Sequence, residues 1–141
     1  MLSRIIFYSI DKAIRTYRKL AQTNIDRAGI AITIDQWLVL RVIEEDQSLT
    51  QTEIAERVLK DQASVARMIA LLLKHGLLAS EPVAHDARRT RLQVTPQGQA
   101  TLAAVEPVIL RNRAQALQGI SEEELATLRR LLERIYLNCS T

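Results

Sequence analysis

The chain has 141 residues, of which 48% are hydrophobic and 25% charged, a composition typical of one globular domain with a real core. No segment approaches the ~20 uninterrupted apolar residues of a membrane span, and the apolar start is followed by regular charges without a small-residue cleavage site, so neither a membrane partner nor a secretory leader is expected. The single cysteine excludes an internal disulfide framework and favours the cytoplasm, while a net charge of +3 decides nothing by itself.

Residues 1–32 are predicted to form an amphipathic helix that ends near Gly29. Apolar residues recur at spacings of four, three, four and three, which places them on one face of a helix. They are Ile6, Ile10, Ala13, Tyr17 and Leu20.

Two capping boxes mark the next helix starts. Thr33 with Gln36 opens a helix that extends to Ile43, and Thr50 with Glu53 opens a shorter one. A third start near Asp61–Ser64 begins a helix that stops at Gly76, a usual residue after a helix end. Two short helices joined by a few residues predict a helix-turn-helix.

The segments 77–83 and 90–95 read as two strands around a loop with the sequence HDARR. Pro96 then begins a long helix that we expect to be interrupted or bent at Pro107 and to end at Gly119. The last helix starts at Ser121 and repeats apolar residues at helical spacing. The predicted fold class is mainly α with a small β-hairpin: a winged helix-turn-helix with N- and C-terminal dimerisation helices.

The combination of motifs resembles the MarR (multiple antibiotic resistance regulator) family of bacterial transcription factors. The matching residues are Thr33–Leu40, Leu49–Glu56, Ser64–Arg67, Gly76–Leu78, Asp86–Arg88 and Val94–Gly98. The order of these motifs, with Asp-x-Arg nine to seven residues before Thr95, carries the resemblance. One position departs from it, because Ala66 stands where the family often has Ser or Thr.

The resemblance implies a homodimer that binds double-stranded DNA, with residues 33–98 as the DNA-binding domain and residues 1–32 and 99–141 as the helical dimerisation region. The helix 64–75 would enter the major groove and the hairpin, or wing, the adjacent minor groove. A small aromatic or anionic effector is a possible further partner, because many members release DNA when such a ligand binds.

The wing concentrates positive charge. Residues 60–91 contain six basic against three acidic residues, whereas residues 33–59 contain two against six. By the resemblance, Arg88 would enter a narrow minor groove, where negative potential is concentrated. Arg89 and Arg91 would contact phosphates, and Asp86 would brace the wing by pairing with an arginine. The alternative is a solvated loop with ordinary surface charge.

The first turns of the two helix-turn-helix elements supply the other candidate DNA contacts. Gln62, Ser64 and Arg67 lie on the polar side of the second helix, where Gln suits adenine and Arg suits guanine. Arg67 is equally open to pairing with a phosphate or a surface acid. Gln51 and Thr52 are candidates for phosphate contacts, or they are only neighbours of a helix cap.

The terminal helices are predicted to dimerise, because a winged-helix core of about 65 residues does not need them all as a cover. The residues predicted at this interface are Ile6, Ile10, Tyr17, Leu125, Leu128, Leu132 and Ile135. Arg15 and Tyr17 are weak ligand-pocket candidates. Trp37 either packs in the core or borders such a pocket.

No catalytic constellation, cofactor motif or metal-ligand spacing is found, so an enzyme is not expected. Cys139 continues the apolar stripe of the last helix and is interpreted as a terminal thiol rather than a redox switch. The leading hypothesis is a homodimeric, sequence-specific regulator, a repressor relieved by a small molecule, that recognises a pseudo-palindromic operator. The alternative is a winged-helix protein–protein interaction module that does not bind DNA.

Overall fold

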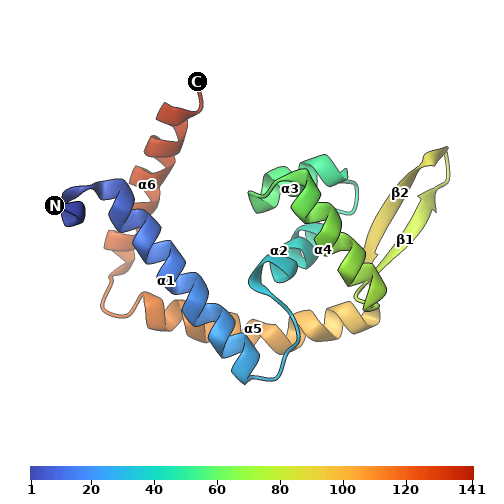
Figure 1. Ribbon diagram of the computed structural model, residues 1–141, viewed down its shortest axis with the longest axis horizontal. Coiled ribbons are helices and arrows are strands. Elements are labelled where there is room, and N and C mark those ends of the chain that lie inside the picture. Colours follow the sequence, from blue (N-terminus) through green and yellow to red (C-terminus); the bar gives the residue numbers. More distant parts are fainter.

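The structure, a computed structural model, describes the backbone of residues 1–141 and every side chain except those of Ala87 and Arg88. Six α-helices, a short 3-10 helix and one two-stranded antiparallel sheet make up the chain (Figure 1). Their bounds are η1 Leu2–Arg4, α1 Ile6–Arg27, α2 Ile34–Glu45, α3 Gln51–Val58, α4 Gln62–Lys74, β1 Leu78–Val83, β2 Asp86–Val94, α5 Pro96–Ala116 and α6 Glu122–Cys139.

The predicted helix starts are confirmed at the level of individual hydrogen bonds. The capping boxes of Thr33, Thr50 and Ser121 are all complete: each side chain accepts from a backbone N–H three residues on, and that residue's side chain accepts from the cap. Asp61 caps α4, and Gly76 follows α4 with a φ of 75°. Local hydrogen bonds therefore set where these helices begin, as the sequence pattern indicates.

The hairpin differs from the prediction. The segment HDARR was expected to be a loop, but β2 begins at Asp86, and the turn is formed by Ala84 and His85. Pro82 pairs with Thr90 while Val83 pairs with Asp86, so the register shifts between these two pairs. This irregularity absorbs the extra residues of the second strand. Arg89 and Arg91 therefore lie on β2, and the expected loop is wrong from Asp86 onward.

One core joins the helix-turn-helix, the sheet and α5. Val39, Leu40, Val65 and Leu72 are almost completely buried in it, together with Val105 of α5. α5 runs without interruption through Pro107, so of the two predicted outcomes, an interruption or a bend, the interruption is wrong. Pro107 lies on the exposed side of α5, where water can satisfy the carbonyl that loses its N–H partner.

α1 lies against α5 through polar as well as apolar contacts. Ile25 is fully buried, and the Asn24 Nδ2 donates to the Asn112 Oδ1 at 2.7 Å. Asn112 is 1% exposed, and among the described residues it is the single polar residue that is buried. A buried amide pair satisfies its members only in one alignment, so it fixes how α1 crosses α5.

The terminal segments bury little. α6 has no buried residue, and α1 buries only Ala21 and Ile25 in its C-terminal half. Figure 1 shows α6 projecting beyond the N-terminal part of α1, away from α2, α3 and α4. The large apolar side chains that remain exposed at the two ends include Ile5, Ile6, Phe7, Tyr8, Ile14, Leu128, Leu131, Leu132, Tyr136 and Leu137.

Candidate nucleic-acid interface

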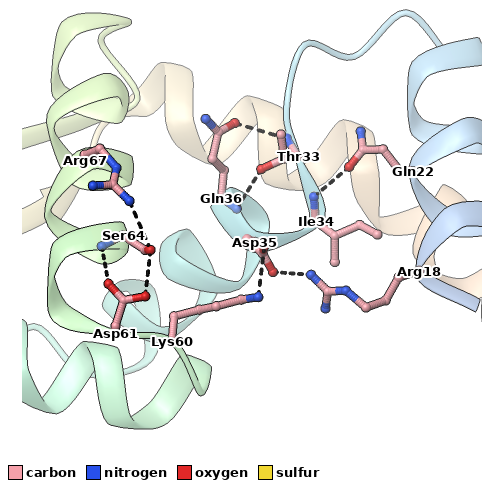
Figure 2. Close-up of polar contacts among 10 residues, drawn as sticks. All are labelled: Arg18, Gln22, Thr33, Ile34, Asp35, Gln36, Lys60, Asp61, Ser64 and Arg67. Atoms are coloured by element: carbon pink, nitrogen blue, oxygen red, sulfur yellow. Dashed lines mark hydrogen bonds and ion pairs between the residues drawn. The ribbon is translucent and has the colours of Figure 1, made fainter. Parts of the chain in front are cut away.

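The first turn of α4 is held by a chain of three polar side chains (Figure 2). The Ser64 N–H and hydroxyl each donate to the Asp61 carboxylate at 2.8 Å, and the Arg67 Nη2 donates to the Ser64 Oγ at 3.2 Å. The bond from the Ser64 N–H is the main reason that the pKa of Asp61 lies below its ordinary value of 3.8. Asp61 therefore stays ionised at neutral pH and orders the polar turn of this helix.

The three predicted base-reading residues thus lie within the first two turns of α4. Gln62 and Arg67 are exposed, and Ser64 is half-buried beneath the arginine. The contact of Arg67 is a neutral hydroxyl, so the guanidinium keeps its charge available to an anion or a base edge. Val65 and Ile69 face the core from the same helix, which turns this polar face outward.

Gln51 and Thr52 are exposed on the first turn of α3, next to the cap at Thr50. The free N–H groups of a helix start favour an anion. The Thr50 N–H is not available to an anion, because it donates to the Glu53 Oε1. This hydrogen bond lowers the pKa of Glu53 below its ordinary 4.5.

A hollow of about 300 Å³ brings the start of α3 and the wing together. Gln51 lines it from α3, and Arg89 and Arg91 line it from β2. These three residues were predicted independently as phosphate contacts. Because they line one hollow, the three side chains can face the same nucleic-acid strand.

The structure describes the side chains of two of the three wing arginines, Arg89 and Arg91. Arg89 and Arg91 are exposed and have no ion pair among the side chains that the structure describes. Glu81 pairs with Arg91 in the strand register, but its carboxylate accepts from the Gln93 Nε2 at 3.2 Å. The side chain of Arg88 lies outside the described residues, so its predicted entry into the minor groove is untested. The bracing role of Asp86 also stays a prediction.

A bridge through Asp35 was missed by sequence reasoning. The Asp35 carboxylate, in the first turn of α2, accepts from the Arg18 Nη2 of α1 with one oxygen and lies 3.6 Å from the Lys60 Nζ with the other. Figure 2 shows it between the two cations. Sequence separations of 17 and 25 residues give no local pattern by which such a bridge is found.

In the turn between α3 and α4, one residue other than glycine adopts the left-handed backbone conformation. Leu59 has a φ of 60° and a ψ of 41°, and its side chain is 86% exposed. Its N–H bonds to Glu56, and the Lys60 N–H bonds to the Ala55 carbonyl at 3.1 Å, which closes the end of α3. Lys60 is therefore held firmly beside the cap of α4.

The three weak ligand candidates, Arg15, Tyr17 and Trp37, have different surroundings in the structure. Tyr17 lines a groove of about 610 Å³ between α1 and α5, whereas Trp37 packs in the core and is 9% exposed. Arg15 is exposed and pairs with Asp11 at 2.9 Å. The Trp37 Nε1 is buried without a hydrogen-bond partner among the described residues. The assignment of these three residues to a ligand site stays a prediction.

The predicted interface residues of the terminal helices lie at the surface of the single chain. Ile6, Leu128 and Leu132 are 59%, 46% and 40% exposed, and the others are half-buried: Ile10, Tyr17, Leu125 and Ile135. Cys139 is an exposed free thiol. Within the described residues, no three His, Cys, Asp or Glu side chains are grouped so that they could hold a metal ion. None of the described helices combines the length and apolar character needed to cross a membrane.

Comparison with known proteins places this geometry in one family. Residues 29–89, which contain α2, α3, α4, β1 and the start of β2, match the model of the MarR family. A protein from Pseudomonas aeruginosa described as a probable transcriptional regulator is 28% identical, with 96% of this chain and 99% of that chain covered and a TM-score of 0.84.

Two further solved structures share the fold at lower identity. BpsR from Bordetella bronchiseptica, whose DNA binding is regulated by 6-hydroxynicotinic acid, is 20% identical with 96% of each chain covered and a TM-score of 0.86. A mutant MarR from E. coli, solved in complex with operator DNA, is 21% identical with 89% of each chain covered and a TM-score of 0.81. Because the match to BpsR covers 96% of this chain, it includes parts of both terminal helices as well as the winged helix.

Proposed function

We propose that this chain, whose residues 29–89 match the MarR family, is a DNA-binding transcriptional regulator of that family and works as a homodimer on a pseudo-palindromic operator. In this proposal it represses transcription in the cytoplasm, catalyses no reaction, and is relieved by a small aromatic or anionic effector. The solved relative whose DNA binding is regulated by 6-hydroxynicotinic acid supports the last point.

The hollow between α3 and the wing is the observation that carries the DNA-binding site. It joins Gln51 to Arg89 and Arg91, and the exposed Gln62 and Arg67 extend the same chemistry along α4. We propose that α4 reads bases in the major groove while Gln51, Thr52, Arg89 and Arg91 bind phosphates. On the family resemblance, Arg88 is assigned to the minor groove and Asp86 to bracing the wing.

The exposed apolar side chains indicate which part of the chain binds DNA and which part dimerises. Residues 33–98 are proposed to be the DNA-binding domain, and residues 1–32 and 99–141 the dimerisation region. Leu128 and Leu132 of α6 and Ile6 of α1 are only partly covered within the chain, and a second copy would bury the rest. Two copies would then present two α4 helices to half-sites about one DNA turn apart.

Selection of bound fragments from the source genome, followed by affinity measurements at several salt concentrations, tests this function. We expect specific fragments to bind more weakly as salt rises, and Arg91→Ala to lower both the affinity and the salt slope, the latter by about 1. Arg67→Ala is expected to relax selectivity at one base position instead. Arg113→Ala, which removes an equal charge at an exposed site on α5, is the matched control.

The outcomes separate the two hypotheses. Equal loss from Arg91→Ala and Arg113→Ala would mean that net charge, rather than the wing, drives binding. A dimer that ignores every genomic fragment but captures a protein at fixed stoichiometry would favour the protein–protein interaction module.

A further inference from the structure

Two sets of polar contacts lie between α1 and the candidate interface, and they meet where Lys60 and Asp61 are neighbours in the chain (Figure 2). Asp35 contacts Arg18 of α1 and Lys60 of the α3–α4 turn. Lys60 is followed directly by Asp61, the cap of α4, which holds Ser64 and through it Arg67. Together the two sets run from a proposed dimerisation helix to a proposed base-reading arginine.

The α1 end of these contacts is fixed by a second side chain. The Gln22 Nε2 donates to the Ile32 carbonyl at 3.1 Å, and the Gln22 Oε1 accepts from the Ile34 N–H at 3.0 Å. These bonds attach α1 to the start of α2, where Asp35 lies. α1 and α2 consequently form one unit at this point, and Asp35 adds a polar contact from that unit to Lys60 of the α3–α4 turn, beside the apolar packing of α2 on α3 and α4.

The negative charge of Asp35 lets it hold two cationic side chains, Arg18 and Lys60, which a neutral side chain could not do. Arg18 and Lys60 approach opposite oxygens of one carboxylate, so removal of the carboxylate leaves two cations close together. The three side chains are 27–38% exposed, so the bridge contributes modestly to the free energy of unfolding. Its role is geometric, because one carboxylate holds Arg18 of α1 and Lys60 of the α3–α4 turn at the same place.

We propose that Asp35 is a positioning residue for DNA recognition: it ties the start of α4 to α1 and thereby sets the separation of the two α4 helices in the dimer. The proposal rests on the proposed function, and it adds a specificity determinant that does not touch DNA. Asp35 selects the spacing between half-sites, while Arg67 and the wing select and hold each half-site.

The test compares Asp35→Asn with the wild-type full chain on the tightest genomic fragment and on copies with one or two base pairs inserted between, or deleted from, its half-sites. Asp35→Asn is expected to weaken binding to the natural spacing by about fivefold, which is about 1 kcal/mol, and to reduce the penalty for altered spacing. The salt slope should stay unchanged, because no phosphate contact is lost.

Three comparisons assign the effect to the bridge. Arg18→Met leaves the carboxylate in the first turn of α2 and should reproduce the relaxed spacing, which a simple loss of favourable helix-dipole interaction would not. The double variant should lose less than the sum of the single losses. Asp11→Asn removes the exposed pair with Arg15 on the same helix and should change neither spacing nor affinity.

Amide hydrogen exchange without DNA provides the second measurement. Asp35→Asn and Arg18→Met should speed exchange in residues 59–64 relative to Asp11→Asn. Unchanged exchange there would overturn the proposal, as would faster exchange with an unaltered spacing preference. A wild-type chain that binds no fragment would instead overturn the proposed function, and exchange would still decide whether Asp35 holds the start of α4.

Discussion

The helix-turn-helix and α6 use apolar residues at similar helical spacing but bury them very differently. Leu40, Val65 and Leu72 are at most 1% exposed, because α2 and α4 face each other and α5. Leu128 and Leu132 of α6 are 46% and 40% exposed. The first region is covered by its own chain, whereas the second depends on a surface that one chain does not supply.

This contrast implies two different kinds of stability. Burial inside the winged helix contributes to the free energy of unfolding of each chain at any protein concentration. Burial of α6 against a second copy contributes only when the dimer forms, so it depends on concentration. Substitutions in the two regions should therefore be distinguishable by dilution.

The largest effect is expected from the double variant Leu128→Asp/Leu132→Asp. Each dimer loses four leucines whose remaining exposed area, 46% and 40% of each side chain, is worth roughly 0.6–1.4 kcal/mol apiece, or about 3–5 kcal/mol together. Burying four carboxylates in their place adds a desolvation cost of several kcal/mol. Sedimentation equilibrium should show a monomer whose far-UV circular dichroism retains the helices of the winged region. A double variant that remains a dimer would place the interface elsewhere.

Leu40→Ala tests the other side of the comparison. Leu40 is 0% exposed, and a cavity at such a site costs about 3–5 kcal/mol. Urea unfolding monitored at two protein concentrations should show the same loss at both, because the leucine packs within its own chain. A loss that changes with concentration would mean that the winged helix also depends on the partner.

The smallest effect is expected at Leu59, an exposed apolar residue inside the winged region. Leu59→Gly relieves a left-handed backbone worth roughly 1–2 kcal/mol, less about 0.5–1 kcal/mol of extra chain entropy in the unfolded state. The expected gain is about 0.5 kcal/mol in thermal unfolding, with no change in oligomeric state. Leu59→Ala keeps the positive φ and should show no such gain.

What could be predicted from the sequence follows from the range of the interactions. The cap of Thr50 by Glu53 and the stop at Gly76 are set by neighbours within four residues, so the pattern alone reveals them. The start of β2 depends on its register with β1, which shifts between Pro82 and Val83, and the sequence pattern does not contain that information.

In the candidate site, too, the residues defined by local spacing were predicted and the one with distant partners was not. Gln62, Ser64 and Arg67 were found because helical spacing places them opposite Val65 and Ile69. Asp35 was missed because its partners, Arg18 and Lys60, come from two other segments. Its position in a first helical turn offered a sufficient local explanation, since an acid there interacts favourably with the helix dipole.

The number of chains bound to one operator-containing duplex tests the central claim most directly, because it joins the winged helix to the terminal helices in a single measurement. Mass determination of the complex over a range of protein concentrations should give two chains per duplex, with no complex of one chain accumulating. A stable complex with a single chain on a full operator would contradict the account, since each winged helix would then bind DNA without the dimer that α1 and α6 are proposed to form.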